Sequence, residues 1–345
     1  MKTIEYTKFG PPEVFQIRNM EKPAPKDHEV LIKVHSTPVS FGDLMARNFK
    51  SIKPGNFTMP FIFWLPSKFY FGWNKPKKNI LGSEFSGVVE TVGKKVTKFN
   101  EGDSVFGYLG QNFGAYAEYF CMPANGLVAM KPSNMTFEEA SAISYGGLTA
   151  WSLLKKSNLP GFHSTPGEKP KVLINGASGG IGSSALPLAR NYYGAEVTGV
   201  CSTPRIDYVK DLGADHVIDY KIEDFTKNGE TYDLIIDILG KSSFASCKQS
   251  LKPGGYYLLA SFKGKQLIQM IRTSFFAGKN RKRVVCALSG YKQQDLVLLR
   301  NLVEEGKMKS IIDKRFPMEK VTEAHNYAES GQKKGNIIIK MEDRR

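Results

Sequence analysis

The sequence predicts an α/β protein with two parts, a doubly wound parallel sheet of six strands and a β-rich domain. Three observations lead to this prediction. A short apolar strand, a glycine-rich turn and a helix follow one another between residues 171 and 193. Short apolar strands then alternate with helical segments as far as residue 288, as in a doubly wound parallel sheet. Strand-like segments separated by Gly and Pro fill the first third of the chain.

The glycine-rich turn, Asn175–Gly182, follows the apolar strand Lys171–Ile174 and precedes a helix from Ser183 to Tyr193. Glycines here let the backbone approach a pyrophosphate, Gly182 allows close packing of helix on strand, and the helix N-terminus attracts anions. We interpret the segment as a dinucleotide-binding unit of the Rossmann type; the alternative is an ordinary turn without a ligand. The expected cofactor contacts in the turn are Ser178, Gly179, Gly180 and Ile181.

The residues after the second strand, Glu196–Cys201, favour NADP(H) over NAD(H). An NAD-preferring site usually has Asp or Glu at this strand's end, where it binds the ribose 2′-hydroxyl. Here Ser202, Thr203 and Pro204 lead to Arg205, so no carboxylate repels a 2′-phosphate and a guanidinium can bind it. Alternatively, Arg205 is a solvated residue that pairs with Asp207.

The remaining elements follow from apolar periodicity. The six strands of the sheet are expected at Val172–Asn175, Val197–Cys201, His216–Asp219, Asp233–Asp237, Tyr256–Ala260 and Val284–Leu288. Pro187 falls inside the first helix and predicts a kink. The β-like segment Asn336–Ile339 indicates that the chain returns to the first domain. We therefore expect a nucleotide-binding domain over residues 127–290 and a substrate domain over residues 1–126 and 291–345.

Charge and cysteine content set further expectations. The net charge is +15, and two acid-free stretches hold nearly all of it: residues 49–78 with six lysines and many aromatics, and residues 262–283 with seven Lys and Arg. Such clusters indicate affinity for something anionic. The four cysteines form no CxxC pair, which argues against a disulfide framework and favours a reduced, cytoplasmic location. We expect no membrane-spanning segment and no signal peptide.

Three further motifs carry a family resemblance: Leu81–Glu90 (Leu-Gly-Ser-Glu-Phe-Ser-Gly-Val-Val-Glu), Gly102–Gly107 (Gly-Asp-Ser-Val-Phe-Gly) and Gly146–Trp151 (Gly-Gly-Leu-Thr-Ala-Trp). Over nearly its whole length the chain resembles the medium-chain dehydrogenase/reductase superfamily, in its zinc-independent, quinone oxidoreductase-like branch. The resemblance implies that the β-rich domain is GroES-like. It also implies a homodimer, which we expect to pair through the sheet edge near Val284–Leu288.

The resemblance also bears on metal and chemistry. The positions matching the catalytic zinc ligands of zinc alcohol dehydrogenases are Ser40, Ser83 and Tyr145, which supply no thiolate or imidazole. We therefore expect no bound metal. The chemistry expected is hydride transfer from NADPH to an acceptor activated by conjugation, a quinone or an α,β-unsaturated carbonyl such as an enone or 2-alkenal.

The resemblance suggests individual site residues as well. Ser202, Arg205 and Tyr220 match residues around the 2′-phosphate, and Thr149 matches a threonine on the nicotinamide side. Candidates for stabilising the developing oxyanion or donating a proton are Ser40, Asp43 and Tyr145. Asp43 is equally well explained as a helix cap, and Ser40 and Tyr145 as polar lining.

The basic, aromatic segment 49–78 allows several interpretations. It can border the substrate cleft, rest on an anionic membrane surface, or be structural with solvated lysines. Single-stranded nucleic acid also suits basic aromatic surfaces, but no nucleic-acid-binding motif accompanies it. A second functional hypothesis follows, in which the protein binds NADPH, is catalytically weak, and uses its basic surfaces on membranes or nucleic acid.

Overall fold

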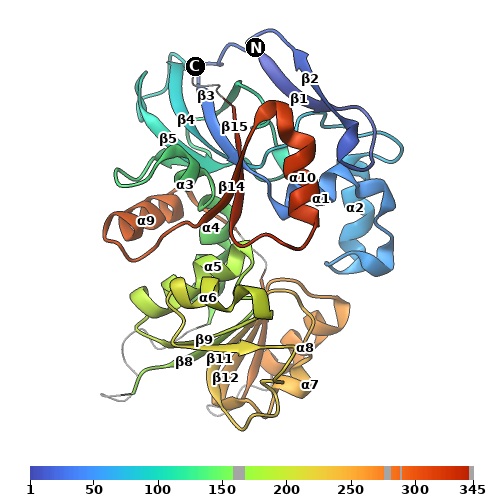
Figure 1. Ribbon diagram of the computed structural model, residues 1–345, viewed down its shortest axis with the longest axis vertical. Coiled ribbons are helices and arrows are strands. Elements are labelled where there is room, and N and C mark those ends of the chain that lie inside the picture. The colour runs from blue at the N-terminus through green and yellow to red at the C-terminus, as the bar shows by residue number, and fades with distance from the viewer. Residues whose placement is uncertain (158–167, 276–280, 288–289, 342–345) are drawn as a thin grey trace.

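The computed structural model describes residues 1–157, 168–275, 281–287 and 290–341. Two domains follow one another along the long axis of the molecule (Figure 1). The domain that holds both chain ends lies at the top of the view, and the nucleotide-binding domain lies at the bottom. This arrangement confirms the predicted α/β fold with a second, β-rich domain.

The sheet of the nucleotide-binding domain has six parallel strands in the order β10-β9-β8-β11-β12-β13. Relative to the first strand this is the 3-2-1-4-5-6 order of a Rossmann sheet. The strands are β8 (Lys171–Asn175), β9 (Glu196–Cys201), β10 (His216–Asp219), β11 (Tyr232–Asp237), β12 (Leu251–Leu259) and β13 (Arg283–Cys286). All six predicted strands are confirmed. The strand β12 begins at Leu251 rather than at Tyr256, and the expected last residue of the sixth strand, Leu288, lies outside the described residues.

Alternating side chains of these strands fill two separate apolar cores, one on each face of the sheet. Leu234 and Ile236 belong to one core, whereas Ile235 between them belongs to the other. All three are fully buried. Because both faces are covered, the strands are apolar at nearly every position, as is usual for parallel sheets.

The helices of this domain are α4 (Ser144–Lys156), α5 (Gly180–Pro187), α6 (Ile206–Asp211), α7 (Phe244–Cys247) and α8 (Gly264–Phe275). The irregularity expected at Pro187 takes the form of a change in helix type. The α-helical part ends at Pro187 and continues as a π-helix over Leu188–Tyr192. Proline lacks the N–H that an α-helix needs at this point, and a wider turn accommodates its loss.

The other domain is built on a seven-stranded sheet in which β6 pairs with β3 beside the path β14-β15-β3-β4-β5-β7. Its strands are β3 (Glu29–Pro38), β4 (Glu84–Val92), β5 (Ser104–Tyr108), β6 (Tyr119–Pro123), β7 (Val128–Met130), β14 (Ile312–Pro317) and β15 (Asn336–Lys340), and a hairpin of β1 (Lys2–Tyr6) and β2 (Phe15–Asn19) lies beside it. The pairing of β15 with β3 confirms that the chain returns to this domain.

The helices of this domain are α1 (Phe41–Arg47), α2 (Phe61–Phe71), α3 (Phe137–Ser141), α9 (Gln293–Glu304) and α10 (Val321–Glu329). The expected boundary at residue 126 is followed by β7, which pairs with β5. The buried leucines of α9 pack in the core of the nucleotide-binding domain. The exact boundaries therefore stay a prediction.

Candidate active site

The glycine-rich turn lies at the carboxyl end of β8, where the strand order reverses between β8 and β11. Gly176 has a φ of 94°, which glycine adopts without strain. A Cβ on Gly182 would lie 2.3 Å from the carbonyl oxygen of Gly176, so the close packing expected there is confirmed. A Cβ on Gly180 would meet no protein atom within 4 Å. Protein packing does not require glycine at this position, which fits the approach of a ligand to the first turn of α5.

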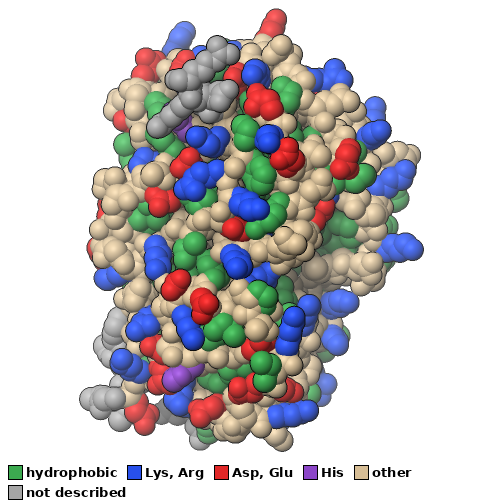
Figure 2. Space-filling view, viewed as in Figure 1, with side chains coloured by type: hydrophobic (Ala, Val, Ile, Leu, Met, Phe, Trp, Pro, Cys, Tyr) green, Lys and Arg blue, Asp and Glu red, His purple; other side chains and the backbone are tan. Residues whose placement is uncertain are grey.

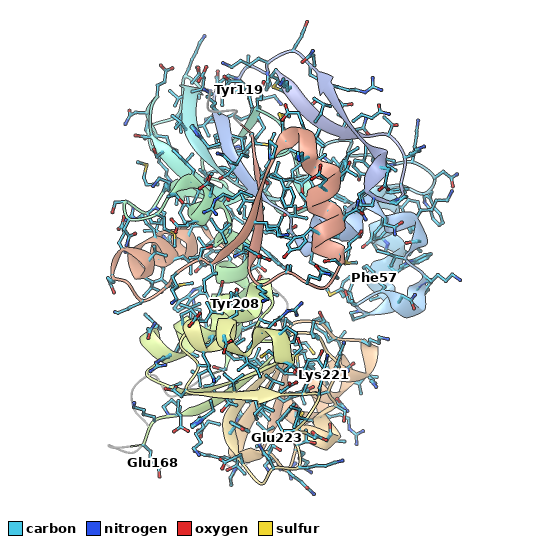
Figure 3. All side chains as sticks on the ribbon, viewed as in Figure 1. Phe57, Tyr119, Glu168, Tyr208, Lys221 and Glu223 are labelled. Atoms are coloured by element: carbon cyan, nitrogen blue, oxygen red, sulfur yellow. The ribbon has the colours of Figure 1, made fainter. Side chains whose placement is uncertain are left out.

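Arg205 and Ser178 come together at this end of the sheet. Nη1 of Arg205 makes a long hydrogen bond of 3.5 Å to Oγ of Ser178, and Nη2 donates to the carbonyl oxygen of Gly331 at 2.7 Å. Within the described part of the chain, Arg205 forms no ion pair with Asp207. Tyr208 of α6, labelled in Figure 3, lies near the junction of the two domains. The guanidinium therefore lies beside the glycine-rich turn, and its role at a 2′-phosphate stays a prediction.

Lys333 is a second cation at this place, which the sequence analysis missed. Burial lowers the pKa of Lys333, and the positive charge of Arg205 lowers it further, whereas Asp313 and Glu84 raise it. Two cations that repel each other favour an anion between or beside them. The sequence offers no signal for this residue, because it approaches Arg205 from a turn near the other end of the chain.

The other expected 2′-phosphate residues lie near the end of β9. Ser202 directly follows the strand and is partly exposed, and Tyr220 is exposed and donates its backbone N–H to the carbonyl oxygen of Cys201. One acid also lies here, Asp219, which accepts a hydrogen bond from the hydroxyl of Thr203. That hydrogen bond lowers the pKa of Asp219, so its carboxylate is charged. The end of β9 itself therefore has no carboxylate, but a charged carboxylate lies close to it, at the end of the adjacent strand β10.

A cluster of hydroxyl groups lies where the two domains meet. Oγ1 of Thr149, on α4, is 2.8 Å from the phenol oxygen of Tyr291. The ring of Tyr108 lies 5.3 Å from that of Tyr145 and 5.9 Å from that of Tyr291, centroid to centroid. Burial raises the pKa of Tyr145 to about 12. At neutral pH its phenol is therefore protonated and can donate a hydrogen bond. Tyr108 and Tyr291 were not foreseen.

Ser40 and Ser83 are neighbours in space, with their Oγ atoms 3.1 Å apart. Asp43 is fully buried beside them: Oδ2 accepts from the backbone N–H and hydroxyl of Ser40, and Oδ1 accepts from the N–H of Gly82 at 2.9 Å. Ser40 and Asp43 form a capping box at the start of α1. The structure thus supports the capping interpretation of Asp43, which holds the two serines in place.

Glu84 is a buried acid next to these serines and was not singled out from the sequence. Its Oε2 accepts hydrogen bonds from Oγ of Ser144 at 3.0 Å and from the N–H of Tyr145 at 2.7 Å. Burial raises the pKa of Glu84 to about 7. It therefore connects β4 to the start of α4, directly below the tyrosine cluster. The position of an acid directly after Ser83, at the start of this strand, was the signal that could have found it.

A groove of about 360 Å³ runs between the domains beside this site. Residues 55–58 line one side, and residues 239–243 and 261–266 line the other. The second group follows β11 and β12, so the groove opens at the carboxyl ends of the sheet, where ligands of such folds bind. Asp237 holds this loop by accepting from the N–H groups of Gly240 and Ser242. The segment 49–78 therefore borders the interdomain groove, as expected.

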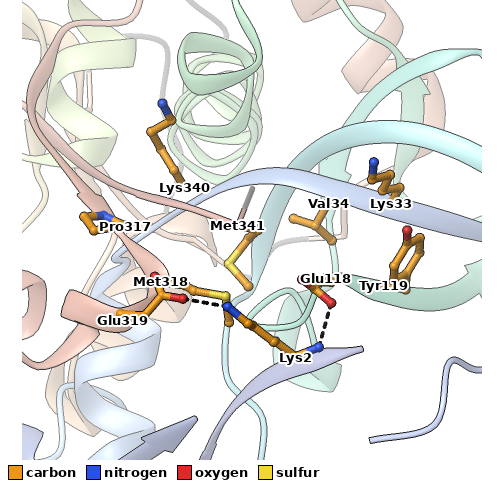
Figure 4. Close-up of a pocket in the computed structure, with 10 residues that line it drawn as sticks. All are labelled: Lys2, Lys33, Val34, Glu118, Tyr119, Pro317, Met318, Glu319, Lys340 and Met341. Carbon is orange, nitrogen blue, oxygen red and sulfur yellow. Dashed lines mark hydrogen bonds and ion pairs between the residues drawn. The ribbon is translucent and has the colours of Figure 1, made fainter. Parts of the chain in front are cut away.

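A second pocket, of about 440 Å³, lies far from these residues, near the two chain ends (Figure 4). Lysines and glutamates line it, and Lys2 donates to Glu118 through its backbone N–H and to Glu319 through its ammonium group. All of its lining residues belong to the domain that holds the chain ends, and none comes from the nucleotide-binding domain. We therefore assign the reaction to the interdomain site and not to this pocket.

Comparisons with known proteins agree with this geometry. Residues 26–132 match the alcohol dehydrogenase GroES-like domain, and residues 212–339 match the family described as zinc-binding dehydrogenase. A mitochondrial NAD(P)H oxidoreductase of Bos taurus is 31% identical over 284 residues, covering 76% of this chain and 70% of the relative. The chain belongs to the medium-chain dehydrogenase/reductase superfamily. Its relatives place it in the zinc-independent, quinone oxidoreductase-like branch.

Two other members of this superfamily are similar over almost the full chain. A 2-methylene-furan-3-one reductase of Solanum lycopersicum is 29% identical over 98% of this chain and 79% of the relative. The solved structure of a quinone oxidoreductase from Coxiella burnetii superposes with a TM-score of 0.78 at 27% identity, covering 99% of both chains. The chain therefore belongs to a family of nicotinamide-dependent oxidoreductases.

The donor set bears on the superfamily's metal. In the part of the chain that the structure describes, no three His, Cys, Asp or Glu side chains lie close enough together to hold a metal ion. The positions that match the zinc ligands hold hydroxyl groups. Ser40 lies beside Ser83, and the backbone N–H of Tyr145 donates to Glu84. These residues do not fit a catalytic zinc site. The absence of bound metal in the purified protein stays a prediction.

Proposed function

We propose that this protein is an NADPH-dependent, zinc-independent reductase that transfers hydride to a quinone or an α,β-unsaturated carbonyl. One observation carries the proposal: hydroxyl groups surround the junction between the glycine-rich turn and the other domain, and the described residues there include no metal-ligating set. Without a Lewis acid, a simple ketone or alcohol is a poor partner, whereas a conjugated acceptor is already activated. The names of two similar proteins, a quinone oxidoreductase and a 2-methylene-furan-3-one reductase, support the same two substrate classes.

The cationic residues support the choice of NADPH. Arg205 and Lys333 approach each other at the carboxyl end of β9, with the hydroxyl of Ser178 beside Arg205. A guanidinium and an ammonium would bind the 2′-phosphate by charge-assisted hydrogen bonds. Gly180, which is open on its ligand side, would let the pyrophosphate reach the first N–H groups of α5. The nicotinamide cofactor, when bound, supplies the hydride.

The hydroxyl cluster would stabilise the oxygen of the acceptor. As the acceptor is reduced, negative charge develops on its carbonyl oxygen, and preorganised donors lower the energy of that state. Tyr145 is such a donor, because its raised pKa keeps the phenol protonated. Tyr291 and Thr149, which are hydrogen-bonded to each other, would supply a second donor. Ser40 donates its one hydroxyl proton to Asp43, so it would line the site without serving as a donor to this oxygen.

The test is a turnover assay with two acceptors in parallel, an ortho-quinone and a short 2-alkenal, monitored by the loss of NADPH absorbance. NADH serves as the cofactor control. Turnover of either acceptor with NADPH and much less with NADH supports the proposal and chooses the substrate class. Equal rates with NADH would reject the cofactor assignment. No turnover despite measurable NADPH binding would favour the second hypothesis, a nucleotide-binding protein with little catalysis.

Tyr145→Phe tests the donor role within the same assay. We expect turnover to fall roughly tenfold or more, since one oxyanion donor is removed, while NADPH affinity stays the same. Tyr119→Phe, at a partly exposed ring far from the site (Figure 3), is the matched control and leaves both values unchanged. The homodimer and the cytoplasmic location stay predictions.

A further inference from the structure

Helix α2 turns apolar residues outward and its one charged residue inward. The outward side chains are Phe61 (65% exposed), Ile62 (71%), Leu65 (45%) and Phe69 (57%). Trp73, just after the helix, is 49% exposed as well, and these five residues are called the α2 face below. Lys68 is 5% exposed, and its ammonium group donates to the carbonyl oxygen of Phe49. A surface helix of a soluble protein normally has the opposite distribution, so folding of the chain does not explain this face.

Exposed lysines surround the α2 face. They are Lys50, Lys53, Lys75, Lys77 and Lys78. No Asp or Glu occurs between residues 49 and 78, so nothing within the segment neutralises them. In Figure 2 the right-hand edge of the molecule, over α2, carries Lys and Arg side chains beside hydrophobic ones. The surface therefore combines exposed apolar side chains with unbalanced positive charge.

Helix α8 continues this character on the other domain. Ile268 and Ile271 are 59% and 50% exposed, and Arg272 is exposed next to them. The two regions are joined, because Nζ of Lys263 donates to the carbonyl oxygen of Gly55 and Met59 packs against the core beneath α8. Large exposed apolar patches on a monomeric surface usually mark an interaction site.

The chemistry of the α2 face restricts what can cover it. A second copy of the chain in a symmetric pair would bring the same lysines against each other, with no acid in the segment to compensate. Single-stranded nucleic acid would stack on the three aromatic rings of the α2 face, but Ile62 and Leu65 of this face are aliphatic and offer no stacking surface. The exposed residues of α8, Ile268 and Ile271, are aliphatic as well. An anionic bilayer accepts both features, since aliphatic and aromatic side chains enter the interface while lysines bind headgroups.

We propose that the α2 face, with its flanking lysines and the outer side of α8, docks the protein on an anionic lipid membrane. The docking site does not depend on the reductase activity and goes beyond it. None of the helices among the described residues is long and apolar enough to cross a bilayer, so the binding is peripheral. The interdomain groove begins at residues 55–58, in the same segment as α2. If the proposed function holds, a lipid-soluble acceptor would enter the groove from the bilayer.

Vesicle co-sedimentation tests the proposal without turnover. The probes are vesicles of phosphatidylcholine alone and of phosphatidylcholine mixed with phosphatidylglycerol. We expect the protein to bind the anionic vesicles, to release them as salt rises, and to bind neutral vesicles far more weakly. The emission of Trp73 shifts to shorter wavelength on binding, and Trp73→Phe removes that shift.

Matched variants assign the binding to the α2 face. The triple variant Ile62→Gln, Leu65→Gln, Phe69→Gln should lose affinity for anionic vesicles roughly tenfold or more. The pair Ile17→Gln, Met20→Gln, exposed on β2 and after it, is the apolar control and binds like the parent protein. If the triple variant does not fold, Lys75→Gln, Lys77→Gln, Lys78→Gln replaces it, with Lys94→Gln and Lys210→Gln as the charge control.

Three results would overturn the proposal. The parent protein does not sediment with anionic vesicles, the α2 variants bind as well as the parent, or a single-stranded oligonucleotide binds more tightly than the vesicles and competes with them. Turnover of a water-soluble acceptor is measured on every variant. A variant that loses vesicle binding but keeps turnover has lost the docking site alone. A variant that loses turnover but keeps vesicle binding has lost the reductase activity alone.

Discussion

At the scale of single residues, Arg205 is the position on which the cofactor preference rests. Arg205→Ala should weaken NADPH binding roughly 10- to 100-fold, because charge-assisted hydrogen bonds to a phosphate are lost, and should change NADH binding little. Dissociation constants for both nucleotides measure the effect. Lys210→Ala, an exposed lysine of the same helical region, is the control and should bind both as before. Equal losses for NADPH and NADH would show that Arg205 has no role at the 2′-phosphate.

Glu84 makes the stability of the protein depend on pH. Burial raises its pKa from 4.5 to about 7, so the folded protein binds this proton more tightly than the unfolded chain does. The corresponding stability is present at low pH and is lost as pH rises through about 7. Glu84→Gln removes this contribution. Between pH 5 and pH 8, the free energy of unfolding of the parent should fall by about 2 kcal/mol more than that of Glu84→Gln.

Urea unfolding at the two pH values gives this difference, with Glu90→Gln as the control because Glu90 lies on the same strand and is partly exposed. A parallel pH dependence of the parent and Glu84→Gln would mean that Glu84 is charged throughout. Burial also raises the pKa of Asp43, to about 6, so Asp43 adds to the pH dependence of stability with the same sign. Because Asp43 is present in both proteins, its contribution cancels when the parent is compared with Glu84→Gln.

The sequence allowed prediction of site residues only where local chemistry identifies them. The glycines of the turn and Arg205 were found because they follow strands at fixed spacing. Lys333, Tyr108 and Tyr291 were missed, because each reaches the site from a different element and only the folded chain brings them to Thr149 or Arg205. Asp43 was singled out from the sequence, but its role was not, because a helix cap and a catalytic acid require the same residue type.

At the scale of elements, the turn between β8 and α5 separates glycines needed for packing from those open to a ligand. Gly182→Ala should destabilise the protein by about 2 kcal/mol, because its Cβ would meet the backbone of Gly176 and Ala177. Gly180→Ala meets no protein atom, so stability should stay unchanged or rise by up to about 1 kcal/mol. The same methyl group should weaken NADPH binding roughly tenfold, because it stands where the pyrophosphate approaches.

Unfolding without cofactor and NADPH titration, applied to both variants, separate these two roles. Unchanged NADPH affinity in Gly180→Ala would reject this placement of the pyrophosphate. Elsewhere, short apolar segments separated by helical segments were sufficient to predict all six parallel strands. Pro187 was recognised as an irregularity, but the π-helical form of Leu188–Tyr192 was not predicted, because it depends on how the following residues re-form hydrogen bonds within the packed helix.

At the scale of the whole molecule, a buried cluster joins the first and last parts of the chain. Arg47 is 1% exposed, and its guanidinium donates to the carbonyl oxygen of Gly10, to Nδ1 of His325 at 3.0 Å and to Glu329. Because arginine only donates, Nδ1 of His325 accepts and Nε2 carries the proton, which it donates to the hydroxyl of Tyr116. The separation of 278 residues between Arg47 and His325 explains why no sequence pattern revealed this cluster.

Removing the guanidinium should therefore loosen the connection between α1 and α10. Arg47→Met keeps a similar length but leaves Nδ1 of His325 and the carbonyl oxygen of Gly10 without their donor, and should lower the free energy of unfolding by about 3 kcal/mol. Arg18→Met, at an exposed arginine of the same domain, is the control and should change it by less than about 0.5 kcal/mol. Urea unfolding compares the two. NADPH affinity of the folded Arg47→Met protein should match that of the parent, because the residues proposed to bind the phosphates lie on the other domain and in the turn before β15. A stability equal to that of Arg18→Met would mean that packing around β3 and β15 holds the chain ends together without this cluster.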